Sequence, residues 1–451
     1  MQREPVQLLE DAQHIWQAGV EAVLPERLIP AHLYVDGNAL FLGEHRLDLG
    51  KVRRIAIVGA GKAAGAMAVA CEASLGTALL AEKDVHGWVN VPADCVVPTR
   101  QIRLHAGRPS GVNEPRPEGL QGTREILKIV SALGPEDLCI CLIAGGGSAL
   151  LVAPVPEVSL AEKIRITQLL SAAGANIEQL NTVRREISQV KGGGLARACG
   201  AGHLITLIIS DVLGDPLEAI ASGPTVLSDR SAQDALDVLE EFKLLNDPAA
   251  QSIANYLRSG SPHDQPSAEG GSETRVTNFV IGNNATAVDA AGIQAERQGY
   301  AHAMLAATAA EGPAEEIGRH LAEMAERMRR QPGPDCLITG GEPVVQLVDE
   351  SLRGKGGRNQ QLALAALEKL QPCEGVVLLA GGTDGEDGPT DAAGAWIDEQ
   401  VVRDARLRGL DAAEHLRRND AYHFFEKAGG LLKTGPTHTN VCDLRVVTVS
   451  R

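Results

Sequence analysis

Lys62 lies in a glycine turn that could hold a phosphate group or another anion. Residues 57–65 read IVGAGKAAG and separate an apolar, strand-like run from a helical pattern. Main-chain N–H groups at Gly61 would face a ligand there, and the lysine would add a mobile positive charge. The same residues match G-x-G-x-x-A, so a dinucleotide site and a purely structural turn are alternatives. Against the dinucleotide, the acid after the second expected strand, Asp94, falls about thirty residues on, instead of roughly twenty.

A second glycine turn follows the apolar run 138–144 and consists of Gly145, Gly146, Gly147 and Ser148. Glycines before a helix can direct main-chain N–H groups toward one point, and the serine hydroxyl can donate another hydrogen bond. This pattern indicates a nest for a carboxylate or phosphate. The alternative is an ordinary N-cap on a tight turn.

Positive charge also gathers in residues 353–361, RGKGGRNQQ, directly before the helical pattern LALAALEKL. The helix dipole disfavours cations at the start of a helix. A bound oxyanion would remove this conflict, so we expect Lys355, Arg358 and Asn359 to contact one.

Two aspartates are candidate ligands for a hard cation. Asp211 follows the aliphatic run 204–210, and Asp384 lies in the acidic turn 381–391, GGTDGEDGPTD. A carboxylate at the end of a strand can hold a cation or accept a proton from a hydroxyl group. The acidic turn does not match the EF-hand spacing, and Mg²⁺ shared with a substrate phosphate is a better fit. A strand-ending cap and a solvated acidic turn are the alternatives.

Residues 181–194, NTVRREISQVKGGG, are interpreted first as a structural helix. Val183, Ile187 and Val190 would face inward, and the dipole favours Lys191 near the C-terminus of such a helix. A functional role for this segment is the less favoured alternative.

Composition excludes several classes of protein. The 451-residue chain has 42 Lys and Arg against 58 Asp and Glu, a net charge of −16, which argues against a nucleic-acid partner. The 49 glycines and 3% aromatic residues fit an α/β protein whose strands end in tight loops. The eight cysteines show no C-x-x-C or zinc spacing, which predicts reduced, mostly buried thiols and a cytoplasmic location.

No membrane-spanning or secretory segment is expected. The N-terminal MQREPVQLLEDAQHIW is charged and lacks the apolar core of a signal peptide. Residues 138–156 carry no charge, but the glycine turn, Pro154 and Pro156 would break a spanning helix.

Short apolar runs alternate with helical patterns on both sides of residues 258–275, a stretch poor in aliphatic residues. Runs without polar alternation predict strands covered on both faces, as in parallel sheets. We therefore expect two α/β domains, an N-terminal Rossmann-like three-layer domain with a mostly parallel sheet (1–258) and a second domain (276–451), joined by a linker (259–275), with the active site in the cleft between them. Strands are expected at 54–58, 85–91, 138–144, 204–210, 276–281, 303–308, 335–339, 375–380 and 443–449.

Taken in chain order, the motifs resemble those of the class II glycerate kinases over about residues 10–450. The matching segments are GAGKAAGAMA, AGGGSALL, N-x-VRR-x-IS-x-x-KGGGLA, ISDVLGDPLEAIASGPT, TGGEPVV, GKGGRNQQLALA, LAGGTDGEDGPTDAAGA and TGPTHTNVCDL. The resemblance implies a C-terminal MOFRL domain and ATP-dependent phosphorylation of D-glycerate, mostly at the 2-hydroxyl, with Mg²⁺. Lys62, Asp211 and Arg358 match the family's proposed functional positions. One departure is Gly107-Arg108-Pro109, where the family commonly has His-Pro.

On this hypothesis Lys62 would hold a phosphate from one domain, and Arg358 would stabilise the transferred phosphoryl group from the other. Asp211 would orient the glycerate hydroxyl or bind Mg²⁺, Asp384 would be a second metal contact, and the 145–148 turn would bind an anionic end of a substrate. Lys62 and Arg358 are thus expected to converge on one phosphoryl group.

Two other functions stay open. Some relatives are named hydroxypyruvate reductase, so NAD(P)H-dependent reduction is the alternative activity, although the missing ribose-binding acid argues against it. A non-catalytic sensor of sugar acids is the other, and the paired cation and carboxylate loops argue against that. The expected partners are D-glycerate and ATP, without nucleic acid or membrane; the sequence does not specify the oligomeric state, for which a homodimer is one alternative.

Overall fold

The structure is a computed structural model of the chain, and it describes residues 3–227, 231–245, 247–248, 250–260, 274–370 and 372–450. The chain divides into two compact units. The N-terminal unit comprises Leu28–Ser210 and Asp215–Ile281, and the C-terminal unit comprises Met1–Arg27, Asp211–Gly214 and Gly282–Arg451.

The N-terminal unit is built on a six-stranded sheet with the order β6-β5-β4-β7-β8-β9. Its strands are β4 (Ile55–Ala60), β5 (His86–Pro92), β6 (Ile102–Arg108), β7 (Leu138–Ile143), β8 (His203–Ile209) and β9 (Arg275–Gly282). The pairings from β6 through β8 are parallel. This strand order is that of the Rossmann fold. The first strand, β4, lies in the middle, and successive strands are added on one side of it up to β6 and then on the other side from β7 onward. The expected Rossmann-like sheet is confirmed, and its ligand-binding crevice should lie at the carboxyl ends of β4 and β7.

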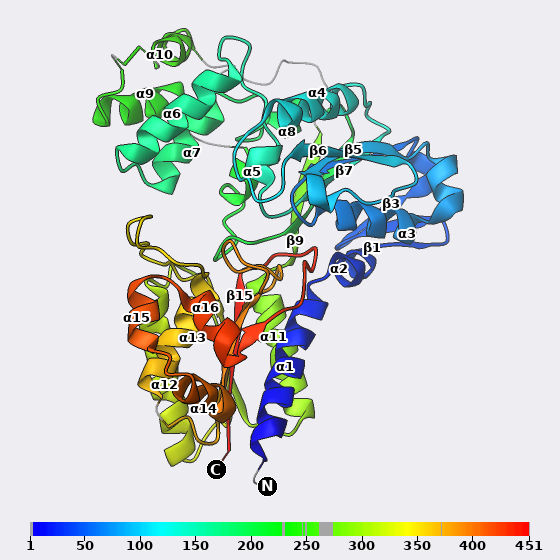
Figure 1. Ribbon diagram of the computed structural model, residues 1–451. Helices are drawn as coiled ribbons and strands as arrows, with labels where there is room; N and C mark the ends of the chain where they lie inside the picture. Colours follow the sequence, from blue (N-terminus) through cyan, green and yellow to red (C-terminus); the bar gives the residue numbers. More distant parts are fainter. Residues whose placement is uncertain are drawn as a thin grey trace. The chain divides into compact units, whose positions relative to one another are not determined.

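Helices cover both faces of this sheet. Figure 1 shows α3 (Ala64–Glu82) and α4 (Pro117–Ser131) on opposite faces, as right-handed crossovers that run in opposite directions along a sheet require. By length and composition, α3 is also the one helix among the described residues that could cross a membrane, but 56% of it is buried inside the protein. It packs against β5, β7 and β4 and is interrupted at Gly76, where φ is 75°. We therefore interpret α3 as a helix of the protein core.

Two further substructures complete the N-terminal unit. An antiparallel meander, absent from the sequence-based expectation, is formed by β1 (Leu33–Asp36), β2 (Ala39–Leu42) and β3 (His45–Asp48). A helical group with its own apolar core contains α6 (Leu160–Ala172), α7 (Ile177–Glu186), α9 (Ala232–Glu241) and α10 (Gln251–Arg258). The short helices are α2 (Pro25–His32), α5 (Gly147–Leu150) and α8 (Gly194–Ala198).

The C-terminal unit has a six-stranded mixed sheet with the order β10-β11-β15-β12-β13-β14. Its strands are β10 (His302–Ala306), β11 (Cys336–Gly341), β12 (Val376–Gly382), β13 (Gly394–Ile397), β14 (Leu431–Leu432) and β15 (Asp443–Val449). Only β10 and β11 pair in parallel, and the other pairings are antiparallel. The expected second α/β domain is confirmed, and its strand directions were not specified by the sequence, because unbroken apolar runs report burial of both faces and not strand direction.

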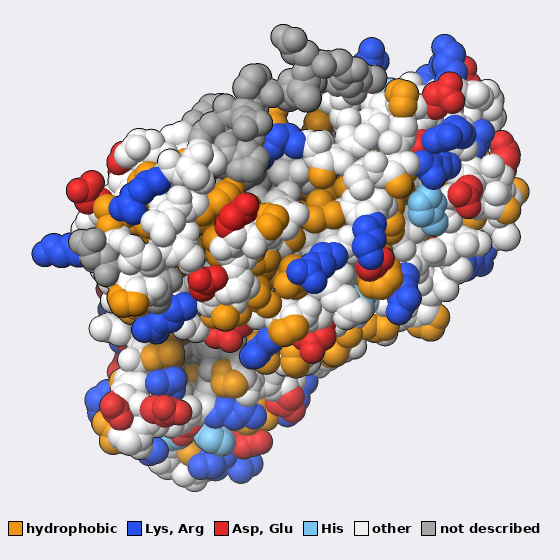
Figure 2. All heavy atoms as spheres, turned by 90° about the horizontal axis from the view of Figure 1, so that it is seen from above, with side chains coloured by type: hydrophobic (Ala, Val, Ile, Leu, Met, Phe, Trp, Pro, Cys, Tyr) orange, Lys and Arg blue, Asp and Glu red, His pale blue; other side chains and the backbone are white. Residues whose placement is uncertain are grey.

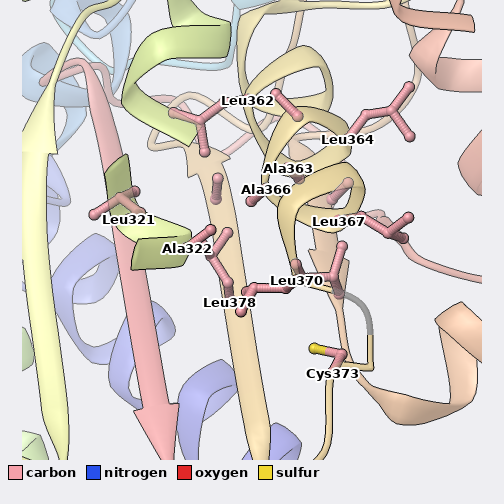
Figure 3. Close-up of a cluster of buried hydrophobic side chains, with 14 of the residues drawn as sticks. Leu321, Ala322, Leu362, Ala363, Leu364, Ala366, Leu367, Leu370, Cys373 and Leu378 are labelled. Carbon is pink, nitrogen blue, oxygen red and sulfur yellow. The ribbon is translucent and has the colours of Figure 1, made fainter. Parts of the chain in front are cut away.

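Both faces of the second sheet are indeed buried. Leu378 of β12 belongs to the core under α12 (Ala314–Arg330) and α13 (Arg358–Lys369), whereas its neighbour Leu379 belongs to the core under α1 (Pro5–Ala22) and α11 (Asn284–Arg297). Successive strand residues point to opposite faces, so these are two separate layers. Figure 3 shows leucines of α12 and α13 gathered around Leu378. The remaining helices are α14 (Glu399–Leu407), α15 (Ala412–Arg417) and α16 (Ala421–Ala428).

The division of the chain differs from the expected boundaries in three places. Residues 1–27 and 211–214 belong to the C-terminal unit, and β9 belongs to the N-terminal sheet. The apolar stripe of α1 predicts burial but does not specify the sheet on which it packs; Trp16 donates to the Gly381 carbonyl at 3.4 Å. Of the expected linker 259–275, residues 261–273 lie outside the described residues.

Other local expectations have clear outcomes. Every expected strand matches an observed strand to within two residues at each end. All eight cysteines are free thiols, and only Cys95 is not fully buried. Figure 2 shows one face of the molecule, on which basic and acidic side chains are interspersed.

Candidate functional site

The two glycine turns of the N-terminal unit lie side by side where β4 and β7 end. The Lys62 N–H donates to the Gly145 carbonyl at 2.9 Å, and the Ala144 N–H donates to the Ala60 carbonyl at 3.2 Å. A Cβ on Gly61, whose φ is 147°, would come within 2.6 Å of the Ala144 carbonyl oxygen. Glycine at Gly61 therefore permits the close approach of the two turns. The Gly147 N–H donates to Ala144 at 3.1 Å, so this expected ligand donor is used inside the turn.

The end of β5, where a dinucleotide-binding fold places its ribose-binding acid, carries a structural amide instead. Asn90 is fully buried and donates to the Leu150 carbonyl at 3.0 Å, and it accepts from Trp88 Nε1 at 3.0 Å. The main-chain carbonyl of Asn90 accepts from the Gly61 N–H at 3.2 Å. Asp94 instead accepts from the Ser110 hydroxyl at 2.8 Å. This geometry argues further against a dinucleotide site.

The hydroxyl of Ser148 is the centre of a cluster of basic and polar side chains. Its Oγ lies 2.6 Å from Lys191 Nζ, 2.6 Å from Arg184 Nη2 and 3.2 Å from Ser222 Oγ. Lys191 Nζ also donates to the Ser148 carbonyl at 2.9 Å and to Ser222 Oγ at 3.3 Å. Asn181 Oδ1 accepts from the Ser222 hydroxyl at 3.2 Å and from Arg184 Nη1 at 3.3 Å. We call Ser148, Asn181, Arg184, Lys191 and Ser222 the Ser148 cluster.

Local structure holds these side chains in place. Arg184 lies in the last turn of α7, whose start is fixed by a capping box between Asn176 and Gln179. Lys191 and Ser222 lie on two loops joined by main-chain hydrogen bonds, including the Gly192 N–H to the Ser222 carbonyl at 3.0 Å. Ser222 is left-handed, with φ of 63°. A non-glycine residue in this region costs about 1–3 kcal/mol, and such strain often accompanies functional sites.

Three basic side chains in or beside the Ser148 cluster, Lys163, Arg184 and Lys191, have uncharged hydrogen-bond partners. Among the residues that the structure describes, no carboxylate oxygen lies within 4 Å of the charged nitrogens of Lys163, Arg184 or Lys191. Burial, reinforced by Arg184, lowers the pKa of Lys163 to about 7. Burial, together with Arg184, Lys163 and Arg185, lowers the pKa of Lys191 well below its usual value. An oxyanion is the ligand that such a cluster would bind most favourably.

The interpretation of 181–194 as one structural helix was wrong for the residues after Glu186. Helix α7 ends at Glu186, so Lys191 is not a helical residue stabilised by the dipole. The signal available in the sequence was the triple glycine after Lys191, which repeats the pattern at 145–147.

The loop Gly107-Arg108-Pro109 contributes another cation. Arg108 is 4% exposed, and its guanidinium packs against Gly146, where an added Cβ would lie only 2.8 Å from Nη2. Arg108 also donates to the Val112 carbonyl. Glycine at position 146 therefore allows Arg108 to reach the 145–148 turn.

In the C-terminal unit, Arg358 is held by two acidic residues. It donates two hydrogen bonds to Asp443, Nε to Oδ2 at 2.7 Å and Nη2 to Oδ1 at 3.0 Å, and Nη1 donates to Glu342 Oε1 at 2.9 Å. The Asp443 side chain is completely buried. The two carboxylates raise the pKa of Arg358 against the opposing effect of burial. Burial raises the pKa of Glu342, and the charges of Asp443 and Asp384 add to this against Arg358.

The start of α13 is capped by a carboxylate of the chain itself. Asp387 accepts from the N–H groups of Asn359 at 3.0 Å and Gln360 at 2.8 Å. Burial raises the pKa of Asp387 to about 7. The conflict between the helix dipole and Arg358 is thus relieved by Asp387, Asp443 and Glu342, and no external oxyanion is required for it.

Two of the residues expected to bind phosphate lie in structural contacts. The Asn359 side chain is fully buried, with Nδ2 3.4 Å from Asp387 Oδ1. Lys355 Nζ lies 4.0 Å from the ring centroid of Tyr422, whose hydroxyl donates to Asp391 at 2.6 Å. Neither contact involves Arg358 or its partners Asp443 and Glu342.

Asp211 belongs to the same unit as Arg358, although β8, the strand just before it in the chain, belongs to the N-terminal unit. Asn440 Nδ2 donates to Asp211 Oδ2 at 3.4 Å, and Cys442 Sγ donates to the Asp211 carbonyl at 3.0 Å. The same sulfur is 4.0 Å from Glu342 Oε2. Asp384 Oδ1 accepts from the Glu386 N–H at 3.1 Å. We call Asp211, Glu342, Arg358, Asp384 and Asp443 the Arg358 group.

The structure therefore brings Lys62, Gly61 and the 145–148 turn together in one unit, and Asp211, Arg358, Asn359 and Asp384 in the other. The convergence of Lys62 and Arg358 stays a prediction. The described residues contain no group of three or more His, Cys, Asp or Glu side chains arranged to hold a metal ion.

Two family models match successive parts of the chain. A family model described as a domain of unknown function (DUF4147) matches residues 11–258, and the MOFRL family model matches residues 335–443. The glycerate kinase of Mus musculus is 37% identical over 98% of this chain and 93% of its own length. The D-glycerate 2-kinase of Thermotoga maritima is 35% identical over 98% of each chain.

A solved structure of glycerate kinase from Thermotoga maritima superposes with a TM-score of 0.83, at 34% identity over 99% of this chain and 100% of that one. A protein of Agrobacterium vitis named putative hydroxypyruvate reductase is 36% identical over 88% of this chain and 99% of its own length. The similarity extends over nearly the whole chain and through both units. The chain therefore belongs to the glycerate kinase family in which a DUF4147 domain is followed by a MOFRL domain.

Proposed function

We propose that this protein is an ATP-dependent kinase that phosphorylates D-glycerate at the 2-hydroxyl, giving 2-phospho-D-glycerate and ADP. The observation that carries the proposal is that a chain of this family has both the basic Ser148 cluster in its N-terminal unit and the carboxylates of the Arg358 group in its C-terminal unit. Phosphoryl transfer needs positive charge around phosphate oxygens and a group that orients the attacking hydroxyl.

The proposed roles follow from chemistry. The 2-hydroxyl oxygen forms a bond to the γ-phosphorus while the bond from that phosphorus to the β-bridging oxygen breaks, and ADP leaves. Lys62 and the 145–148 turn would hold anionic groups at the end of β4 and β7. Asp211 would orient the 2-hydroxyl and accept its proton. Arg358 would offset charge on the transferred group, with its guanidinium oriented by Asp443 and Glu342.

Mg²⁺ is part of the proposal. It is commonly bound by one or two carboxylates together with substrate phosphates, and not by a complete protein cage. Asp211 and Asp384 are hard oxygen donors in the unit that carries Arg358, so they fit this use. Bound there, the ion would neutralise phosphate charge.

The reductase alternative is disfavoured by Asn90 at the end of β5, although a relative carries that name. We also propose a cytoplasmic protein that acts on small molecules, without a nucleic-acid or membrane partner. The oligomeric state, for which a homodimer is one alternative, can be measured by light scattering.

The test is incubation with ATP, Mg²⁺ and D-glycerate, followed by phosphorus NMR of the product. The expected product is 2-phosphoglycerate, and its formation should be strongly slowed in Lys62→Met. Formation of 3-phosphoglycerate would contradict the assigned hydroxyl. Oxidation of NADPH by hydroxypyruvate without phosphoryl transfer would contradict the kinase.

A further inference from the structure

A buried lysine whose described hydrogen-bond partners are all uncharged needs a physical explanation. Lys191 is 0% exposed, and its ammonium group donates to Ser148 O, Ser148 Oγ and Ser222 Oγ, which are all uncharged. Arg184 Nη2 donates to the same hydroxyl oxygen of Ser148 at 2.6 Å. Two basic groups thus meet at one small hydroxyl, although burial of unpaired charge is costly.

The charges around Lys191 make the imbalance larger. Arg184 and Arg185 come from α7, and Lys163 comes from α6, with its Nζ donating to the Arg184 carbonyl at 3.0 Å. These are the charged groups that act on Lys191, and all are basic. Replacement of one by a neutral residue would relieve repulsion, so packing alone does not explain their presence together.

Access to the cluster is available through Ser148. Ser148 is partly exposed, whereas Lys191, which donates to it, is fully buried. Arg108 approaches the same turn at Gly146. A small anion that reached Ser148 would therefore meet hydrogen-bond donors from the serine, the arginine and the lysine.

We propose that Arg184, Lys191 and Ser148 form an oxyanion-binding subsite that takes a carboxylate or phosphate group. The inference deepens the proposed function, because such a group could be the carboxylate of the acceptor or a phosphate of the donor. Burial and the neighbouring cations lower the pKa of Lys191, and a bound anion would act in the opposite direction and stabilise the ammonium form. Any proton that Lys191 takes up when the anion binds would appear as proton uptake by the protein.

The test is calorimetric titration of the full-length protein at pH 8 with inorganic phosphate, ATP and D-glycerate, and with glycerol as a ligand without a carboxylate. Each titration is repeated in buffers of different ionisation enthalpy, which reports proton uptake. In Lys191→Met we expect binding of at least one oxyanion to weaken tenfold or more, with loss of the proton uptake seen in the wild type. Ser148→Ala should weaken the same ligand and is less demanding for the fold. Lys128→Met, at an exposed lysine paired with Glu125 in the same unit, is the control and should bind as the wild type does.

The ligands separate the two sources of the anion. Weakening confined to D-glycerate assigns the subsite to the acceptor carboxylate, and weakening confined to phosphate and ATP assigns it to the donor. The inference is overturned if the wild type binds no oxyanion, or if Lys191→Met and Ser148→Ala both bind all of them within twofold of the wild type. Failure of the proposed function looks different: proton-linked anion binding would persist while no phosphate passes from ATP to D-glycerate.

Discussion

Arg184 and Arg358 are both largely removed from solvent, but their surroundings are opposite. Arg184 donates to the hydroxyl of Ser148 and the amide oxygen of Asn181, and burial lowers its pKa. Arg358 has Asp443 and Glu342 as partners, and they raise its pKa. The surplus charge is therefore positive around Arg184 and negative around Arg358. Residue type alone would not distinguish these two arginines.

The difference assigns different chemistry to the two units. The Ser148 cluster of the N-terminal unit is suited to holding an anion, since no carboxylate oxygen of the described residues lies within 4 Å of the charged nitrogens of Arg184 or Lys191. The C-terminal unit is suited to orienting a hydroxyl and to sharing a metal ion with phosphate, since its carboxylates outnumber Arg358. Arg358→Ala would leave buried Asp443 without its cation, so it should lower stability as well as activity.

The largest expected difference between the two units is in the free energy of unfolding after one cation is removed from each. Arg358→Met should lower the free energy of unfolding by about 3–5 kcal/mol, because it leaves a buried carboxylate unpaired. Lys191→Met should change it by less than about 1 kcal/mol, or raise it, because relief of repulsion offsets the lost hydrogen bonds. Urea unfolding measures both values, with the exposed Arg353→Met as the control. Equal losses in the two variants would show that the units do not differ in this way.

Activity separates the units in a second way. Lys62→Met should lower kcat by about 10²–10³-fold, the usual effect of losing one donor to a developing charge. Since Lys62 is only half-buried, its unfolding curve should match that of the wild type, whereas Arg358→Met should lose activity and stability together. Steady-state kinetics and urea unfolding test this, with Lys51→Met as the matched control. Wild-type turnover in Lys62→Met would remove this lysine from the mechanism.

A pH profile sharpens the description of the N-terminal unit. The pKa of Lys163 is about 7 in the folded protein, below its ordinary 10.5, so between these values the unfolded chain binds the extra proton. Wild-type stability should therefore rise with pH from about 7 to 10, by up to about 1.4 kcal/mol per pH unit. Lys163→Met should lack this contribution in urea unfolding at pH 7, 8 and 9. An identical slope in variant and wild type would contradict the lowered pKa.

The C-terminal unit should show a smaller effect of opposite sign. Burial raises the pKa of Asp387 from 3.8 to about 7, so between these values the folded protein holds the extra proton. Its contribution to stability should fall as pH rises from about 4 to 7, by up to about 1.4 kcal/mol per pH unit over this narrower range. Asp387→Asn should flatten this fall while keeping an acceptor for the start of α13. The comparison fails if wild type and variant have parallel profiles over that range.

Much of the fold could be predicted because the signals are local. Fully apolar runs marked the main strands, and the stripe of Leu321 and Met328 marked α12. Side-chain pairing was less predictable. Glu323 and Arg327 lie four residues apart on the same helix and could have paired. Instead, Glu323 Oε1 lies 3.3 Å from Lys369 Nζ of α13, and Arg327 Nε donates to Gln331 Oε1 at 3.1 Å. A helix surface offers several partners within reach, and the packing of its neighbours selects among them.

By itself, the sequence determined where most strands of the two six-stranded sheets and the glycine turns lie, and it indicated candidate residues for phosphate chemistry such as Lys62 and Arg358. These properties depend on hydrophobic periodicity and on the chemistry of single residues. Only the tertiary structure decided the antiparallel pairing of β15, the packing of α1 on the second sheet, the transfer of Asp211 to the Arg358 group, and the contact between Lys191 and Ser148. Each of these joins segments far apart in the chain, and burial and charge balance select such partners only when the whole chain is folded.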